Sequence, residues 1–385
     1  MVQAPELLKK MVLLIGNYTP DQQQSMQRFS AMMLQGLAAA GVPVELIRPE
    51  PVLGKIKSLG TFAAKWLAYI DKYIFFPGKL KRKLSMEPAL VHICDHSNAV
   101  YAKNCKPHQT LVTCHDLLAV RGALGEQTDC PASAAGRMLQ RWILKGLQRA
   151  DVLACVSCAT ADDAERLVVR GKKRPRISVV PMGLNYRYRK LPLEIARGRL
   201  AGINKFDVDA PFALHVGSNL RRKNRDAVLR IFARCRIKWN GRFVFAGDLL
   251  NAQLMSLARQ LEIADRIAQL ENPTSETLEA LYNCAVALVY PSRFEGFGWP
   301  VIEAQACGCP VICTNSGPLP ETAGDAGLFH DVADEDGFAS DLLRLTDPVE
   351  RAKWSDKSLR NAERFSSEKM IAQYLDLYHS LGAKL

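Results

Sequence analysis

Two glutamates, Glu295 and Glu303, follow the apolar run Val286–Tyr290 in a segment rich in glycine. The run predicts a buried strand, so both carboxylates lie near a strand end, where parallel sheets bind their ligands. The spacing alone is weak evidence, because Glu271 and Glu279 repeat it. The surrounding strand, turn and helix pattern therefore carries the prediction of a site. The alternative is a pair of solvent-facing glutamates.

The turn between the two glutamates has the composition of an anion site. Gly296 and Gly298 allow a tight turn that exposes backbone N–H groups. Pro300 is well placed to begin a helix, and a helix N-terminus directs unpaired N–H groups and a partial positive charge at a ligand. The segment predicts a site for an anionic ligand.

A second turn is basic. The apolar run Ala213–Val216 ends at Gly217, and Arg221, Arg222 and Lys223 precede a helical pattern. A strand, a glycine turn and cations at a helix start form a suitable cradle for a diphosphate. The alternative is an exposed basic turn without a ligand.

The segment from Ser292 to Ile312 resembles the signature of the retaining family-4 glycosyltransferases, which have the GT-B fold. The matching residues are Ser292, Glu295, Gly296, Phe297, Gly298, Pro300, Glu303, Ala304, Ala306, Gly308, Pro310, Val311 and Ile312. The turn 316–321 resembles the Gly-Gly-x-x-Glu turn of that family, with serine at the first glycine and one extra residue. The resemblance is strong over about 211–330 and looser before it.

The resemblance implies the roles of individual residues. The catalytic residues that it implies are His115, Arg222, Lys223 and Glu295, and the donor-binding residues are Gly217, Ser218, Gly296, Phe297, Gly298 and Glu303. Glu295 would hold hydroxyl groups of the donor sugar, and Glu303 would accept hydrogen bonds from the ribose. Arg222 and Lys223 would neutralise the diphosphate. Ser218 stands where many members have arginine.

The first half resembles the family more loosely. His115 follows a predicted strand, as in members whose His-Asp pair meets the donor sugar; a simple strand-end turn is the alternative. After the first strand, Gly16-Asn17 replaces the Gly-Gly of many members. No G-x-G-x-x-G follows that strand and no P-loop motif is present, which disfavours dehydrogenases and P-loop enzymes.

The implied activity is that of a retaining, nucleotide-sugar-dependent hexosyltransferase. It would move a sugar from a nucleotide-diphosphate-sugar to a hydroxyl of a glycan or lipid-linked acceptor and form an α-glycosidic bond. The attack would come from the face that the leaving phosphate occupies. No cofactor and no metal are expected, and a mannosyltransferase of polysaccharide biosynthesis fits the resemblance. The alternatives are a nucleotide-sugar-binding scaffold without transferase activity and a sugar-nucleotide epimerase of the same fold.

Apolar runs alternate with helical patterns and then the alternation restarts, which predicts an α/β protein with two Rossmann-like domains (GT-B) that face a central cleft. We expect an N-terminal Rossmann-like acceptor-binding domain at 1–200 and a C-terminal Rossmann-like nucleotide-sugar-binding domain at 201–366. A C-terminal helix at 367–385 could return to the N-terminal domain.

Positive charge is concentrated in the first half. Residues 1–190 hold 28 Lys and Arg against 14 Asp and Glu, which is a net charge of +14. The whole chain has a net charge of +12, so the second half is slightly negative. The densest patch, 55–83, predicts contact with an anionic membrane surface. Its aromatic residues recur at helical spacing beside Lys65 and Lys72; they are Phe62, Trp66, Tyr69, Tyr73 and Phe76. The alternative is that this stripe packs on the domain core. No motif for nucleic acid accompanies the charge.

The eleven cysteines include one C-x-x-C pair, Cys155 and Cys158, and a cluster at 307–313. We expect free thiols that act as small apolar residues in a reducing compartment. No apolar run approaches the roughly 18 residues that span a bilayer. We therefore expect a cytoplasmic protein, with a peripheral position on the inner face of the membrane as one alternative.

Overall fold

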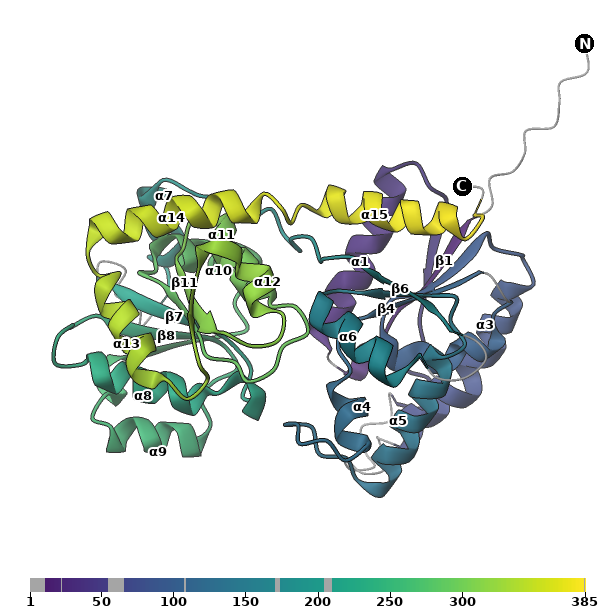
Figure 1. Cartoon of the computed structure of the whole chain (residues 1–385), viewed down its shortest axis with the longest axis horizontal. Coiled ribbons are helices and arrows are strands. Elements are labelled where there is room, and N and C mark those ends of the chain that lie inside the picture. Colours follow the sequence, from purple (N-terminus) through teal and green to yellow (C-terminus); the bar gives the residue numbers. More distant parts are fainter. Residues whose placement is uncertain are drawn as a thin grey trace, which may run out of the picture. The chain divides into compact units, whose positions relative to one another are not determined.

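The computed structural model describes residues 11–21, 23–54, 66–106, 109–169, 174–203, 210–383 and 385 (Figure 1). The chain divides into two compact units. The first comprises the described residues up to Asn185 together with those from Ser367 onward, and the second is Tyr186–Ser366.

Six parallel strands form the sheet of the first unit, in the order β2-β1-β3-β4-β5-β6. They are β1 (Val12–Ile15), β2 (Val44–Ile47), β3 (Leu90–Ile93), β4 (Thr110–Cys114), β5 (Val152–Cys155) and β6 (Arg176–Val179). The four central strands are buried throughout, as expected when helices cover both faces of a parallel sheet. The strand order reverses between β1 and β3, the position at which such sheets bind ligands.

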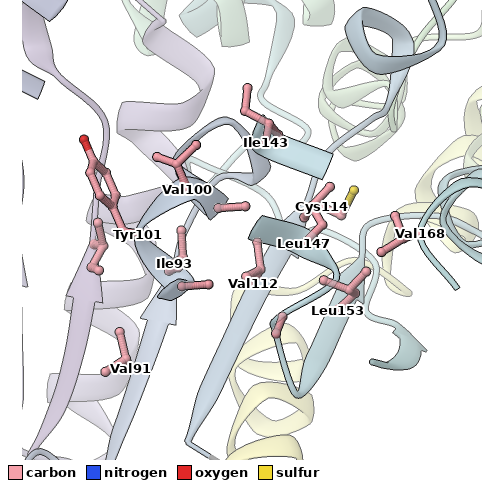
Figure 2. Packing of buried hydrophobic residues seen from close by; sticks show 14 of the residues in the cluster. Val91, Ile93, Val100, Tyr101, Val112, Cys114, Ile143, Leu147, Leu153 and Val168 are labelled. Carbon is pink, nitrogen blue, oxygen red and sulfur yellow. The ribbon is translucent and has the colours of Figure 1, made fainter. Parts of the chain in front are cut away.

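Helices pack around this sheet. They are α1 (Gln24–Ala39), α3 (Phe76–Leu84), α4 (Leu118–Ala123), α5 (Ala134–Leu147), α6 (Cys158–Leu167) and α15 (Ser367–Ser380), together with the 3-10 helices η1 (Thr19–Asp21) and η4 (His96–Asn104) and the π-helix η3 (Asp71–Phe75). Figure 2 shows the core that forms beneath them, where Ile93 and Val112 of the strands meet Ile143 and Leu147 of α5. Burial of these apolar side chains holds the helices to the sheet.

The second unit repeats the architecture, with the strand order β12-β11-β10-β7-β8-β9. Its strands are β7 (Phe212–Gly217), β8 (Arg242–Gly247), β9 (Ile267–Glu271), β10 (Leu288–Tyr290), β11 (Val311–Thr314) and β12 (Gly327–His330). The order reverses between β7 and β10. The predicted pair of Rossmann-like domains is therefore confirmed.

The helices of the second unit connect these strands. They are α7 (Leu193–Leu200), η5 (Arg221–Lys223), α8 (Arg225–Cys235), α9 (Ala252–Gln260), η6 (Ala264–Arg266), α10 (Ser275–Cys284), α11 (Trp299–Ala306), α12 (Leu319–Ala323), η7 (Gly324–Ala326), α13 (Glu335–Arg344) and α14 (Pro348–Ala362).

The structure places the boundary between the units after Asn185 rather than near residue 200. The segment that follows is bound to the second unit through Glu279 of α10. Glu279 is buried, and it accepts hydrogen bonds from the Arg189 backbone N–H at 3.1 Å and from Arg199 at 2.6 Å. A buried carboxylate requires such partners, so this segment stays with α10.

Helix α15 belongs to the first unit. Two buried tyrosines attach it to the sheet: the Tyr378 hydroxyl lies 2.7 Å from Nδ1 of His92, and the Tyr374 hydroxyl lies 2.8 Å from the Thr113 hydroxyl. His92 also contacts Thr113 at 2.8 Å, so the four side chains form one buried network.

The aromatic residues predicted to form one stripe within 55–83 do not face solvent together. Phe76 is buried, and Tyr73 packs on the first core with its ring 4.9 Å from that of Trp142. Trp66, in contrast, is more than half exposed. The packing alternative therefore holds for two of these rings. The other members of the pattern include Phe62 and Lys65, which lie outside the described residues.

All eleven cysteines are free thiols. Within the described ranges, no three His, Cys, Asp or Glu side chains are grouped so that they could hold a metal ion. None of the helices that the structure describes has the length and apolar character needed to cross a membrane.

Candidate functional site

The loops after β7 and β10 carry most of the predicted site residues. Gly217 ends β7 and is followed by η5, which includes Lys223. Tyr290 ends β10, and Glu295 lies in the next loop. These two strands flank the reversal of strand order, where doubly wound sheets bind their ligands. The fold therefore brings the two sequence motifs to one edge of the sheet.

Glu295 is the centre of a cluster of charged and polar groups. Lys223 Nζ donates to Glu295 Oε1 at 2.6 Å and to the Tyr290 hydroxyl at 2.6 Å. Arg222 Nη1 donates to Glu295 Oε2 at 2.8 Å. The Tyr290 hydroxyl donates to Glu295 Oε1 at 2.8 Å. The cations of the first motif and the glutamate of the second are thus direct partners.

Burial and charge act in opposite directions on this cluster. Burial alone would raise the pKa of Glu295, but Lys223 and Arg222 outweigh it and lower that pKa to about 2. Burial lowers the pKa of the Lys223 ammonium, and the Glu295 carboxylate counteracts this shift. Glu295 is therefore ionised at neutral pH and holds two cations at the edge of the sheet.

This pKa shift predicts how the stability of a Glu295→Gln variant depends on pH. In the wild type the folded-state pKa of Glu295 lies below the ordinary 4.5. The ionised carboxylate therefore stabilises the folded protein fully above about pH 5, and this contribution is lost as the pH falls towards 2. The variant leaves two cations without their carboxylate. We expect the gap in Tm between wild type and variant to narrow between pH 5 and about pH 3. Thermal denaturation at a series of pH values measures it.

The exposed Glu276 provides the matched control. A Glu276→Gln variant should show a Tm difference from wild type that is small at every pH. A gap for Glu295→Gln that stays constant from pH 7 to about pH 3 would contradict the ion cluster.

The loop that presents the two cations is fixed by its backbone. Asn224 adopts a left-handed conformation with a φ of +53°, and its side chain donates to the Pro291 carbonyl at 2.9 Å. The Arg293 backbone N–H donates to the Arg222 carbonyl at 2.7 Å. These bonds join the loop after β7 to the loop after β10, so Arg222 and Lys223 are held in place before any ligand binds.

Gly217 lies where two strand ends approach each other closely. Gly247, which ends β8, has a φ of +118°, and a Cβ added there would lie 2.2 Å from the Gly217 carbonyl oxygen. The buried guanidinium of Arg225 donates to the same carbonyl. The turn is therefore determined by backbone packing. The donor contacts of Gly217 and of the half-buried Ser218 remain predictions.

Helix α11 positions the second glutamate. Gly298 precedes the helix with a φ of +106°, and Pro300 lies in its first turn as predicted. Glu303 is buried, and the Tyr282 hydroxyl donates to its Oε2 at 2.9 Å. Burial and the nearby carboxylate raise the pKa of Tyr282, so the phenol stays protonated and remains a donor. Each of the two glutamates is thus bound by a buried tyrosine.

Phe297 stabilises the turn before α11. Its side chain is buried and packs against Phe365, with ring centroids 5.7 Å apart, and its carbonyl accepts a hydrogen bond from Thr322 at 2.8 Å. Gly296 precedes it and is half-buried. The predicted contacts of Gly296 and Phe297 with a donor would come from their backbone amides.

His115 lies in the first unit, directly after β4. Its Nε2 is 2.9 Å from the Cys94 carbonyl, and its ring packs edge-on against Phe29. Burial lowers the pKa of His115, so the imidazole is neutral and Nε2, which faces a carbonyl, carries the proton. Its Nδ1 is a buried acceptor without a hydrogen-bond partner among the described residues, which would suit a ligand hydroxyl. The sugar contact of His115 remains a prediction.

The loop after β1, where Asn17 replaces a glycine, is built into the same edge of the first sheet. Asn17 is buried and donates to the carboxylate of Asp95, which follows β3. The Asn98 side chain donates to the side-chain amide oxygen (Oδ1) of Asn17 at 3.2 Å. The asparagine side chain thus joins the loop ends of β1 and β3.

Sequence reasoning assigned no role to three residues that hold the predicted site residues in place. Tyr290 binds Lys223 and Glu295, Tyr282 binds Glu303, and Asn224 fixes the cation loop. A tyrosine inside an apolar run resembles any core aromatic, so no local pattern distinguishes it. The left-handed Asn224 after a basic turn was a usable signal, because asparagine tolerates positive φ.

The architecture is the GT-B fold. Over 97% of this chain and 100% of that protein, the structure resembles sucrose-phosphate synthase from Thermosynechococcus elongatus with a TM-score of 0.75 at 21% sequence identity. It also resembles Anabaena HepE, solved in complex with UDP and glucose, with a TM-score of 0.71 at 15% identity over 96% of this chain and 100% of that one. At these identities the likeness establishes the fold.

The second unit carries the match to a sequence family. Residues 197–360 match the profile of "Glycosyl transferases group 1". The chain is 42% identical to the O-antigen chain mannosyltransferase B of Escherichia coli over 107 residues, which are 28% of each protein. Across eight curated relatives with which it aligns, the chain spans between 27% and 66% of the length of each.

Proposed function

We propose that this protein is a retaining glycosyltransferase that moves a sugar from a nucleotide-diphosphate-sugar to a hydroxyl group and forms an α-glycosidic bond. The observation that carries the proposal is the partly buried cluster of Glu295, Lys223 and Arg222 at the strand-order reversal of the second sheet. The match of residues 197–360 to group 1 glycosyl transferases supports it.

In the proposed donor complex, Arg222 and Lys223 bind the diphosphate. Lys223 has three N–H donors, and two of them point to Glu295 and Tyr290. The third is available for a phosphate oxygen. The negative charge on the β-phosphate grows as the bond to the sugar breaks, so a cation held at that place stabilises the transition state more than the ground state.

The remaining donor contacts follow from the second motif. Glu303 accepts hydrogen bonds from the two ribose hydroxyls, while Tyr282 fixes its other oxygen. The backbone amides of Gly296 and Phe297 and the carboxylate of Glu295 bind the sugar hydroxyls. The N-terminus of α11, after Gly298, faces the phosphates.

The proposed chemistry requires one bond to break and one to form on the same face of the sugar. The bond between C1 and the β-phosphate oxygen breaks, the acceptor oxygen bonds to C1, and the acceptor proton passes to the leaving phosphate. His115 contacts the sugar near C1. The positive charge comes from Arg222 and Lys223, so the proposal needs no metal and no other cofactor.

The donor and acceptor classes extend the proposal. The matched part of the E. coli mannosyltransferase supports mannose as the sugar, and Anabaena HepE, solved with UDP and glucose, supports a uridine donor as the competing case. We propose a glycan or lipid-linked acceptor in polysaccharide biosynthesis, because the first half of the chain carries a net charge of +14. We also propose a cytoplasmic location, because the eleven cysteines are free thiols.

The experiment is a transfer assay with GDP-mannose and UDP-glucose as donors and a bacterial glycolipid extract as acceptor. The proposal predicts release of the nucleoside diphosphate that depends on the acceptor, and NMR of the product should show an α-anomeric proton. Nucleotide binding without acceptor-dependent release would favour a nucleotide-sugar-binding scaffold. A β-linked product would contradict retention.

A further inference from the structure

Three segments of the first unit, 72–86, 96–106 and 130–150, contain eleven Lys and Arg (five, two and four) and no Asp or Glu. They include most of η3 and all of α3, η4 and α5, and both α3 and α5 pack against η4. The Tyr73 ring of η3 also lies 4.9 Å from the Trp142 ring of α5. The three acid-free segments therefore adjoin one another on one side of the first unit, and their exposed residues share a surface.

The exposed face of η3 and α3 carries both apolar and basic side chains. Ile74 is 65% exposed and Phe75 is 46% exposed. Lys81 lies seven residues after Ile74, Arg82 lies seven residues after Phe75, and both cations are exposed. A spacing of seven places residues on the same face of a helix, so Ile74 lies beside Lys81 and Phe75 lies beside Arg82.

Helix α5 has a face of the same kind. Met138 is 71% exposed, and Arg141 and Lys145 follow it at intervals of three and four residues. The opposite face of α5 contributes Ile143 and Leu147 to the core. Two neighbouring helices thus each present exposed apolar side chains beside cations.

Ion pairs hold only part of this charge. Lys72, Lys79, Lys83 and Lys106 form salt bridges with Asp21, Glu50, Glu45 and Glu87. Six other cations of these segments form no salt bridge with any described residue; they are Lys81, Arg82, Lys103, Arg137, Arg141 and Lys145. Among the described residues, these six positive charges are therefore not compensated by ion pairs.

We propose that this surface binds a membrane rich in anionic lipid. We call it the basic face and define it by Ile74, Phe75, Lys81, Arg82, Met138, Arg141 and Lys145. Cations are attracted to anionic headgroups, and exposed apolar side chains enter the boundary between headgroups and acyl chains. A nucleic acid would engage the cations and leave Ile74, Phe75 and Met138 in water, so the combination favours lipid. This proposal does not depend on transferase activity.

The test is co-sedimentation of the full chain with vesicles. One set contains equal parts of phosphatidylglycerol and phosphatidylcholine, and the other contains phosphatidylcholine alone. We expect binding to the anionic vesicles, weakening strongly as salt rises from about 50 mM to about 0.5 M because the Debye length shrinks. Two double variants divide the basic face: Lys81→Glu with Arg82→Glu, and Ile74→Ser with Phe75→Ser. Each should lower the partition coefficient at least tenfold.

The second unit offers a matched control. Ile237 is 88% exposed and neighbours the exposed Lys238, so Ile237→Ser with Lys238→Glu makes the same kinds of change elsewhere. This control should bind vesicles as the wild type does, and thermal denaturation should show all variants folded. Equal binding to both kinds of vesicle would overturn the proposal, and so would unchanged binding by both double variants. Displacement of the wild type from anionic vesicles by RNA, but not by added anionic lipid, would also overturn it.

Discussion

Replacing Lys223 with alanine should lower kcat by about tenfold or more while the protein remains folded. Lys223 Nζ lies 2.6 Å from Glu295 and 2.6 Å from the Tyr290 hydroxyl, and the proposed function places it against the departing diphosphate. Charge on that group is greatest in the transition state, so the loss should fall on kcat more than on the KM for the donor. Steady-state kinetics at saturating acceptor separate the two constants.

The kinetic result needs two controls. Lys238→Ala removes an exposed cation elsewhere in the second unit and should leave kcat unchanged. Arg222 remains paired with Glu295 in the Lys223→Ala variant, so thermal denaturation should show a folded protein. Wild-type turnover by the folded variant would refute the assignment of Lys223 to the diphosphate.

Replacing Glu303 with glutamine should weaken the binding of the donor nucleotide by about tenfold or more. A hydrogen bond to a charged group contributes roughly 1.5–3 kcal/mol, and the proposed function gives Glu303 two such bonds from the ribose. The amide keeps the size of the side chain but loses the charge. Isothermal titration calorimetry with the nucleoside diphosphate measures the change in Kd.

Two further variants test whether this effect arises from the ribose contact. Tyr282→Phe leaves the carboxylate in place but removes the hydrogen bond at 2.9 Å that orients it, so it should weaken binding by a smaller factor. Glu276→Gln, on the exposed side of α10, should have no effect. Unchanged nucleotide affinity in Glu303→Gln would exclude Glu303 from the ribose site.

The six strands of the first sheet, its edge strands β2 and β6 included, and the four central strands of the second sheet could be predicted from the sequence. The strands β1, β3, β4 and β5 are buried throughout, and their mostly apolar residues give a strong signal. The two strands at the edges of the second sheet, β9 and β12, were missed. Both have exposed or half-buried positions and polar residues, such as Gln269 in β9, so they lack that signal.

The two site motifs could be predicted because each lies within a short segment with its own strand, turn and helix. Their mutual contact could not be predicted: Glu295 and Lys223 are 72 residues apart, and only the strand order of the sheet brings them together. The unit boundary has a similar explanation. The pairing of Arg199 with the buried Glu279 assigns α7 to the second unit, and that pairing spans 80 residues.

The aromatic pattern of 55–83 shows a limit of helical periodicity. The pattern predicted a stripe but could not distinguish a buried stripe from an exposed one. In the structure, Phe76 enters the core while its neighbour Phe75 is exposed. Which side of a helix is buried depends on what packs against it, and here Tyr101 of η4 covers Phe76, with ring centroids 4.9 Å apart.

The central claim is that the second unit binds a nucleoside diphosphate through Lys223, Arg222 and Glu303. The most direct measurement is a thermal shift of the wild type with UDP, GDP and ADP. A ligand at about 100 times its Kd adds roughly 2.7 kcal/mol, which raises the Tm of a protein of this size by a few degrees. We predict a rise with one base, reduced in Lys223→Ala and Glu303→Gln. No rise with any of the three nucleotides, or an equal rise in both variants, would contradict the account.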